Sequence, residues 1–223
     1  MAVQYANGRI ITDGLVLSLN AADQNSYPGS GTTWSDISGG GNNATLTNGP
    51  TFNSANGGTI VFDGTDDKAQ TSYGPQLGDF TICLWFKDNG SGGYGRIADK
   101  SYTGGFWLGR NGTSANSWGG GILEASSPYG IFLTLTDGDW HFFTSIRSGT
   151  THYLYGDGIT NTTSNTVSSN ALDSTTIALG DWSGSNVQAF KGNIASCIVY
   201  NRALSTTEIL QNYNATKSRF GLK

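Results

Sequence analysis

Hydrophobic and polar residues alternate in short runs along most of the chain, and this period of two is typical of β-strands. Three leucines at positions 15, 17 and 19 share one face of the first expected strand. Both faces of residues 80–86 are largely apolar, so we expect this strand in the middle of a sheet. Further strands are expected at residues 60–62, 105–109, 121–123, 131–135, 140–146, 152–155, 176–179 and 193–200.

Glycine-containing turns separate these runs. Asp63-Gly64, Asp137-Gly138 and Gly156-Asp-Gly158 are sequences that favour tight turns. About ten or more short strands at this spacing favour a sandwich of sheets, and no repeat of about 40 residues indicates a propeller. The polar tract 160–170 is expected to be an exposed loop or an edge strand.

One segment predicts a helix, which begins near Thr206 and ends near Lys217. Ser205 and Glu208 have the spacing of a capping box, in which each side chain binds the other residue's backbone N–H. Apolar residues at 209, 210 and 213 follow at helical spacing, so this helix should pack on the sandwich.

The composition fits one all-β domain. The 223 residues include 33 glycines, and only 13% are charged. A chain of this length can bury a sizeable core without disulfides or metals, and sandwiches of roughly 200–250 residues are often undivided. We therefore predict an N-terminal arm at residues 1–12 and a single domain at residues 13–223.

The charge, the apolar runs and the N-terminal sequence argue against several kinds of partner and targeting segment. A formal charge of −4 and a pI near 4.9 argue against a nucleic-acid partner, which would require a basic face. No apolar run approaches the roughly 18 residues of a spanning helix, so we expect no membrane insertion. The N-terminus lacks the basic and apolar regions of a signal peptide.

Cys83 and Cys197 both lie inside apolar strand patterns, which predicts two buried thiols. A disulfide between them would require neighbouring strands with Cα atoms within about 7 Å, and spacing alone leaves that open. Two cysteines are too few for a zinc site.

Seven segments in order resemble the laminin-G-like branch of the concanavalin A-like jelly rolls. They are Asp13–Leu17, Trp34–Asn43, Ile60–Gly64, Phe80–Trp85, Trp140–Phe143, Tyr153–Gly158 and Gly192–Ile209. The resemblance implies an all-β fold, a two-sheet antiparallel jelly-roll sandwich with one short C-terminal helix. Because this fold hosts lectins, glycosidases and structural modules alike, it does not choose between these functions.

A narrower resemblance concerns Tyr27–Trp34, Leu46–Phe52 and Gln211–Phe220, which look like modules of tailed-phage structural proteins. It implies a non-catalytic virion structural or decoration protein, made in the host cytoplasm and located on the virion surface. Capsid or tail proteins would be its partners, through the arm or the terminal helix. Host cell-surface glycans would be a second partner, and a homo-oligomer is compatible with symmetric virion sites. The alternatives are a carbohydrate-binding lectin outside a virion and, third, a glycoside hydrolase.

The carboxylates argue against an enzyme. Retaining glycoside hydrolysis requires two carboxyl groups about 5 Å apart, yet Glu124 and Glu208 are the only glutamates and neither has an acidic neighbour two or four positions away. Asp137 and Asp139 flank a glycine, where a turn is the expected use. Neither histidine completes a recognisable Ser–His–Asp arrangement.

Asp63, Asp66 and Asp67 are the candidate metal ligands, because calcium prefers several oxygens from a glycine-containing loop. The resemblance implies one structural calcium on a rim of the sandwich. However, Ala195 and Ser196 stand where many relatives have an aspartate. The alternatives are therefore one structural calcium or no cofactor, with Asp63-Gly64 serving only as a turn.

Aromatic residues in glycine- and serine-rich segments are the candidate binding residues, because sugar rings and protein partners both pack on aromatic faces. The candidates for carbohydrate or partner binding are Trp118, Trp182, Tyr129 and Tyr94. Trp118 is expected to be the most exposed of them. Trp107 and Trp140 are expected to pack in the core.

Overall fold

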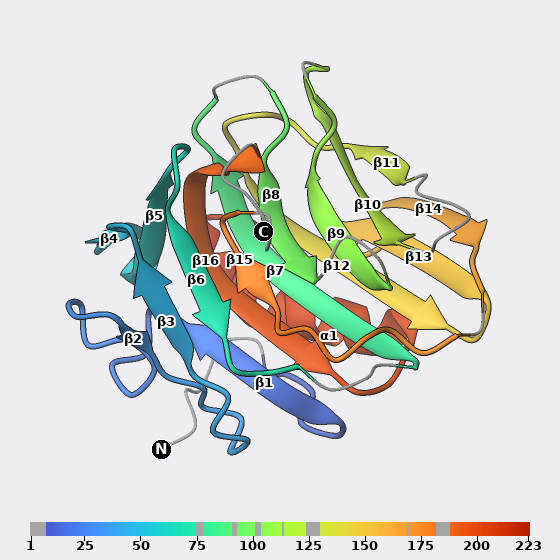
Figure 1. Ribbon diagram of the computed structural model, residues 1–223, viewed down its shortest axis with the longest axis horizontal. Coiled ribbons are helices and arrows are strands. Elements are labelled where there is room, and N and C mark those ends of the chain that lie inside the picture. The colour runs from blue at the N-terminus through green and yellow to red at the C-terminus, as the bar shows by residue number, and fades with distance from the viewer. Residues whose placement is uncertain are drawn as a thin grey trace.

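Two antiparallel β-sheets face each other in the computed structural model of the chain (Figure 1). The structure describes residues 8–74, 78–90, 93–100, 104–112, 114–123, 130–168, 170–181 and 188–223. Within these ranges each sheet contains eight strands. The all-β jelly-roll sandwich with a short C-terminal helix is thereby confirmed.

The first sheet has the order β14-β13-β12-β7-β16-β5-β4, and β1 also pairs with β16. Its strands are β1 (Leu15–Asn20), β4 (Thr51–Asn53), β5 (Thr59–Asp63), β7 (Phe80–Asp88), β12 (Trp140–Ser148), β13 (Thr151–Gly156), β14 (Asn161–Thr166) and β16 (Lys191–Tyr200). As predicted, the segment around residues 80–86 lies inside the sheet, between β12 and β16. Residues 161–166 of the polar tract form the edge strand β14.

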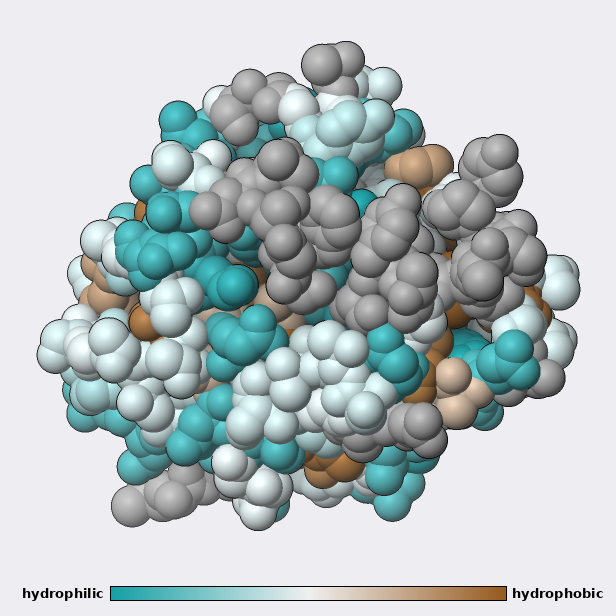
Figure 2. Space-filling view, viewed as in Figure 1, coloured by the Kyte–Doolittle hydropathy of each residue, from teal (hydrophilic) through white to brown (hydrophobic). Residues whose placement is uncertain are grey.

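The second sheet has the order β11-β10-β9-β8-β15-β6-β3-β2. Its strands are β2 (Thr33–Trp34), β3 (Ala44–Thr47), β6 (Lys68–Thr71), β8 (Arg96–Lys100), β9 (Gly105–Arg110), β10 (Ser117–Leu123), β11 (Ile131–Thr134) and β15 (Ala178–Leu179). Figure 2 shows the molecule from the same side as Figure 1, and the described residues there are mostly hydrophilic or neutral, with hydrophobic ones in small separate areas.

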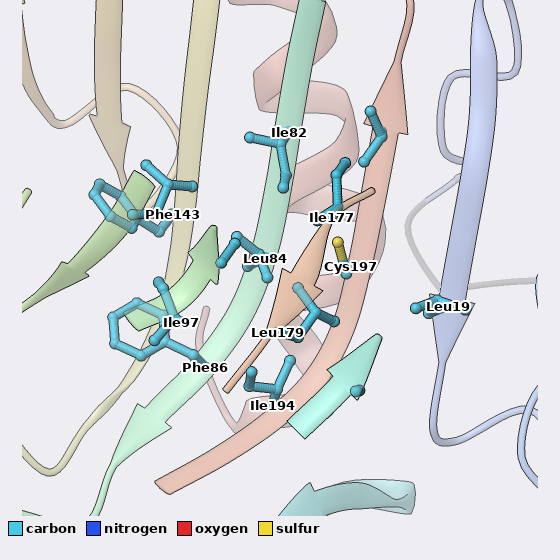
Figure 3. Packing of buried hydrophobic residues seen from close by; sticks show 14 of the residues in the cluster. Leu19, Ile82, Leu84, Phe86, Ile97, Phe143, Ile177, Leu179, Ile194 and Cys197 are labelled. Atoms are coloured by element: carbon cyan, nitrogen blue, oxygen red, sulfur yellow. The ribbon is translucent and has the colours of Figure 1, made fainter. Parts of the chain in front are cut away.

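The main hydrophobic core lies between the two sheets. Ile82, Leu84 and Phe86 of β7 point toward Leu179 of β15 and its neighbour Ile177, and all five are fully buried (Figure 3). The alternation in β7 places these three residues on the same face. The strand therefore contributes its even-numbered residues to the space between the sheets.

A second hydrophobic cluster covers the opposite face of the first sheet. It forms under the helix α1 (Thr206–Thr216) and the short helix η3 (Lys217–Phe220). The Trp85 ring lies 4.2 Å from that of Phe220 and 5.8 Å from that of Tyr213. Its Nε1 donates a hydrogen bond to Thr216 Oγ1 at 2.7 Å. The first sheet is therefore covered on both faces, which explains why both faces of β7 are apolar.

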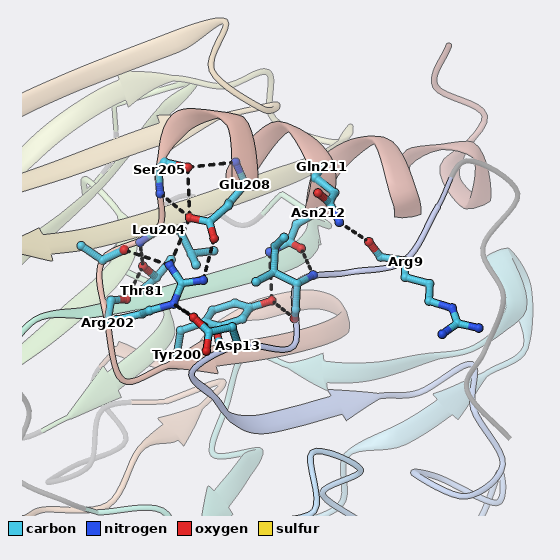
Figure 4. A network of polar contacts seen from close by, with 12 residues as sticks. Arg9, Asp13, Thr81, Tyr200, Arg202, Leu204, Ser205, Glu208, Gln211 and Asn212 are labelled. Atoms are coloured by element: carbon cyan, nitrogen blue, oxygen red, sulfur yellow. Dashed lines mark hydrogen bonds and ion pairs between the residues drawn. The ribbon is translucent and has the colours of Figure 1, made fainter.

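The predicted capping box is confirmed at the start of α1 (Figure 4). The Glu208 N–H donates to Ser205 Oγ at 3.3 Å, and the Ser205 N–H donates to Glu208 Oε2 at 2.8 Å. Arg202 donates to the same carboxylate at 2.6 Å. The hydrogen bond from Arg202, together with those from Ser205, lowers the pKa of Glu208 to about 2. Glu208 is thus engaged in helix capping and ion pairing.

The described end of the predicted N-terminal arm lies along α1 (Figure 4). Ile11 donates its N–H to Asn212 Oδ1 at 2.8 Å, and Ile11 O accepts from the Tyr200 hydroxyl at 2.9 Å. Gln211 Nε2 donates to Arg9 O at 2.9 Å. The rest of the arm, residues 1–7, lies outside the described residues. None of the described helices has the length and apolar character needed to cross a membrane.

The two cysteines are buried free thiols, as predicted. They lie on neighbouring strands, but Cys83 is opposite Ile198, and Cys197 is opposite Leu84. This offset of one residue places them on different faces of the sheet. Cys83 packs in the cluster under α1, whereas Cys197 packs between the sheets. In this arrangement the two thiols do not meet, which answers the question that their spacing left open.

Candidate binding groove

The prediction that Trp118 is an exposed aromatic residue is wrong. Its side chain is 1% exposed and packs between the sheets, with its ring 4.6 Å from that of Phe86. The glycine-rich sequence around it forms the strand β10 and not a loop. The glycines at 119 and 121 leave space for neighbouring rings, because a Cβ there would come within 2.2 Å of Phe132 and 2.7 Å of Trp107. These glycines accommodate packing and do not indicate a loop.

The other predicted aromatic residues have different outcomes. Tyr94 is 61% exposed, and whether it binds a ligand stays a prediction. Trp182 and Tyr129 lie outside the described residues. Trp107 is buried as expected, with the Arg96 guanidinium 4.2 Å from its ring. Trp140 is not in the core as expected, since it is only partly buried at the edge of the cluster under α1.

Asp137 belongs to a partly buried network with Arg110 and Asp88. Arg110 lies between two carboxylates, 2.5 Å from Asp88 and 2.6 Å from Asp137. Asp137 also accepts hydrogen bonds at 3.0 Å from Trp118 Nε1 and from the Asn116 N–H. The carboxylate is thus engaged by a cation and two further donors. Glu124 lies outside the described residues.

The structure brings Asp63, Asp66 and Asp67 together. One carboxylate oxygen of each lies within 4.8 Å of the others. The Asp63 N–H donates to Asp67 Oδ2 at 2.8 Å, and the Thr65 N–H donates to Asp63 Oδ1 at 2.7 Å. Burial raises the pKa of Asp67, and the negative charges of Asp63 and Asp66 raise it further. The three residues build the predicted turn, and their spacing also suits the oxygen ligands of calcium.

Two adjoining pockets form a groove on the outer face of the first sheet, which the sequence did not reveal. One has a volume of about 360 Å³ and the other about 270 Å³, and both are lined by Lys87 and Trp140. The first is also lined by Asp139, His141, Asp157, Tyr213, Phe220 and Leu222. The second is also lined by Asn53, Ala55, Asn56, Thr59, Asn89 and Asn193.

Strand pairing places the floor of the groove. Lys87 of β7 is opposite Trp140 of β12 on one side and Asn193 of β16 on the other. Alternation puts this row on the same face as Trp85 and Phe142, which the C-terminal segment covers. The row of Lys87 is one step beyond that covered area. It therefore remains accessible between the C-terminal segment and the loop before β5.

The walls of the groove are held by contacts that are distant in the sequence. The Phe220 ring lies 4.6 Å from that of Trp140. Next to it, Arg219 Nε donates to Asn56 O at 2.5 Å, and Asn56 Nδ2 donates back to Arg219 O at 3.2 Å. Arg219 Nη1 also donates to Asn20 Oδ1 at 3.0 Å. The C-terminal segment and the loop around residue 56 are thus joined, and each provides one wall.

Amide side chains dominate the pocket next to β16. Asn89 Nδ2 donates to Asn193 Oδ1 at 2.9 Å, and Asn193 Nδ2 donates to Thr59 Oγ1 at the same distance. Asn193 is thus held in one orientation, whereas Asn89, Asn53 and Asn56 are exposed. These amides provide both donors and acceptors beside the ring of Trp140.

His141, which lines the larger pocket, is held by two hydrogen-bond acceptors. Its Nδ1 lies 2.9 Å from Asp157 Oδ2, and its Nε2 lies 2.8 Å from Thr136 O. Since a carboxylate and a carbonyl only accept, the doubly protonated ring satisfies both. Burial opposes the charge, but the hydrogen bond and the charge of Asp157 outweigh it. The pKa of His141 therefore lies above its ordinary value.

The groove has the elements of a small-ligand site: the partly exposed ring of Trp140, convergent polar side chains and the ammonium group of Lys87. The larger pocket, of about 360 Å³, lies at the lower end of the range of about 300–1,000 Å³ that is common for such sites, and the smaller one, of about 270 Å³, adjoins it. An aromatic face with amides around it suits a ring that has apolar C–H groups on one side and hydroxyls at its rim. Sugars have this chemistry.

Comparisons with known proteins agree with the fold. The profile of the family described as "Concanavalin A-like lectin/glucanases superfamily" matches residues 63–210. Comparison with curated protein sequences found no match. The chain is similar to domain 4 of AbnA, an arabinanase from Geobacillus stearothermophilus, in complex with arabinotriose, with 16% identity and a TM-score of 0.68. The similar region covers 89% of this chain and 98% of the arabinanase domain.

Two toxin binding domains are also similar. The binding domain of Paraclostridial Mosquitocidal Protein 1 is 15% identical to this chain, with a TM-score of 0.69. For that of Botulinum neurotoxin DC in complex with SialylT, the identity is 18% and the TM-score 0.69. In both cases 92% of this chain is covered, but it spans only 52% of the toxin domain. At these identities the similarity concerns the fold.

Proposed function

Because the chain belongs to the concanavalin A-like lectin/glucanase superfamily, we propose that it is a non-catalytic, lectin-like domain that binds an oligosaccharide in the groove. The observation that carries this proposal is the row of Trp140, Lys87 and Asn193 on the open part of the first sheet. Trp140 provides a stacking face for a sugar ring, and the amides around it bind the hydroxyls.

Two further observations support this proposal. The similar arabinanase domain was solved with arabinotriose, and one similar toxin domain with SialylT. Within the described residues, two of the candidate acids are engaged elsewhere, Asp137 with Arg110 and Glu208 with Arg202. Two aspartates line the groove, Asp139 and Asp157, and the carboxylate of Asp157 is held by His141 and by the Phe142 N–H. A glycoside hydrolase would need two carboxyl groups free to act on one sugar bond.

Replacing Trp140 by alanine is expected to weaken glycan binding about 30-fold, because a central aromatic residue contributes about 2 kcal/mol or more. A glycan array would identify the ligand, and calorimetry would measure the affinity. Phe132→Ala is the matched control, since Phe132 is an exposed aromatic residue on the second sheet and should leave the affinity unchanged. Melting curves would establish that both variants fold. An unchanged affinity of Trp140→Ala, or no glycan binding by the wild type, would contradict the proposal.

We infer further that the domain is a virion structural or decoration protein of a tailed phage. This rests on the three segments Tyr27–Trp34, Leu46–Phe52 and Gln211–Phe220, and on the position of residues 9–12 along α1. One surface thus presents both segments that we expect to contact a shell. Mass spectrometry of purified particles should find the chain in a fixed ratio to a major shell protein. Its absence from particles would leave a lectin that acts outside a virion.

We also propose one structural calcium ion at Asp63, Asp66 and Asp67. Calcium at about 100 times its dissociation constant should raise the melting temperature by about 5–10 °C. A chelator should reverse the rise, and Asp63→Ala should abolish it. Asp139→Asn, which changes an exposed aspartate outside the cluster, should keep the response. Identical wild-type melting curves with and without chelator would show that the three aspartates form only a turn.

A further inference from the structure

Lys87 has a central position in the groove, because it lines both pockets. It is half-buried, and none of the ion pairs between described residues involves it. Arg110 and Arg202, in contrast, each contact two carboxylates. Lys87 thus provides a positive charge inside the groove, beside the ring of Trp140 and the amide of Asn193.

The two sides of Lys87 differ in charge. The pocket toward β16 has four asparagines and a threonine among its lining residues and no acidic residue. The pocket toward α1 has Asp139 and Asp157, and Asp157 accepts from His141 and from the Phe142 N–H. An anionic group would be repelled on the α1 side. On the β16 side the anionic group would meet Lys87 and amide side chains, which can donate N–H hydrogen bonds to it.

We infer that the oligosaccharide in this groove carries a carboxylate, which Lys87 binds on the side of Asn89 and Asn193 while a neighbouring ring stacks on Trp140. This inference rests on the proposed function and names the chemical class of its ligand. A charge-assisted hydrogen bond is stronger than a neutral one. Among the described residues that line the groove, Lys87 is the one cation outside an ion pair, since His141 is paired with Asp157. This, with the net charge of −4, favours a glycan with one carboxylate over a densely charged polyanion.

The test is a glycan array that holds matched pairs. Each pair consists of a glycan with one sialic or glucuronic acid and its neutral counterpart without the carboxylate, and sulfated polymers form a third group. The wild type should bind the carboxylated members about tenfold or more tightly, as expected for a hydrogen bond to a charged group. Lys87→Met should abolish this preference, because the carboxylated member of each pair should then bind no more tightly than its neutral counterpart.

Lys68→Met is the matched control, because it removes the same charge from the second sheet and should keep the preference. Melting curves of both variants would establish folding. Raising the salt concentration should reduce the preference, since screening weakens a partly exposed charge pair.

The outcomes separate this inference from the proposed function. Equal binding of both members of each pair, or a preference for sulfated polymers, would overturn the carboxylate inference while the groove remained a sugar site. A preference that survives in Lys87→Met would overturn the role of this lysine. Binding to no glycan at all would instead contradict the proposed function itself.

Discussion

Replacing Arg110 by methionine is expected to lower the free energy of unfolding by about 3–5 kcal/mol, the cost of removing one partner of a buried ion pair. The side chains of Arg110 and Asp88 are only 9% and 5% exposed. Burial already raises the pKa of Asp88, and Arg110 counteracts this effect. Without the guanidinium, two carboxylates would remain close together with little access to water.

Arg202→Met is the matched control for this prediction. Arg202 also bridges two carboxylates, Asp13 and Glu208, but its side chain is 29% exposed. Since exposed ion pairs contribute about 0–1 kcal/mol, the loss should be much smaller. Urea unfolding would measure the free energy of unfolding of both variants. Adding Asp88→Asn to Arg110→Met should recover part of the stability, because it removes the unpaired charge. Equal losses for the two arginine variants would refute this account of the network.

Acidification from pH 6.5 to pH 4 is expected to cost about 3 kcal/mol of stability through His152 alone. His152 is a fully buried residue of β13, the strand between β12 and β14. Its Nε2 lies 2.9 Å from Ser145 Oγ. Burial lowers its pKa from 6.5 to about 4. The unfolded chain therefore takes up a proton in this range while the folded chain does not. The contribution of His152 to the free energy of unfolding is therefore fully present above pH 6.5 and is lost as the pH falls toward 4.

His141 contributes with the opposite sign and in a different range. The pKa of His141 in the folded chain lies above 6.5. Its contribution to the free energy of unfolding is therefore fully present below pH 6.5 and is lost as the pH rises through the pKa of the folded chain. Unfolding measured between pH 4.5 and 8 should separate the two histidines. His152→Gln should flatten the acid slope, whereas His141→Gln should keep it and remove the decline above pH 6.5. An acid slope unchanged in His152→Gln would show that other groups cause it.

The outline of the fold could be predicted because it depends on local chemistry. Alternation of apolar and polar residues predicted strands such as β7, and the spacing of Ser205 and Glu208 predicted the start of α1. Two apolar faces predicted that β7 lies inside a sheet. In each case the period of side chains along a strand or helix is set by the backbone, so the pattern can be read from neighbouring residues.

The binding residues could not be predicted in the same way. Trp118 lies among glycines, which indicated a loop, but these glycines make room for the rings of Phe132 and Trp107 on neighbouring strands. Trp140 stands at the end of a strand, where core packing was expected, but the C-terminal segment ends before it covers the whole row. Each error has the same origin, since exposure depends on what packs against a residue.

The sequence by itself determined the β-sandwich, the capped helix and the buried character of both cysteines. Only the tertiary structure decided that Lys87, Trp140 and Asn193 form one row, and that Cys83 and Cys197 face opposite ways. Side-chain alternation determines which residues share a face of a strand. It does not determine which other strand pairs with that strand or in which register. These depend on pairing between segments distant in the chain, and a shift of one residue would exchange the faces.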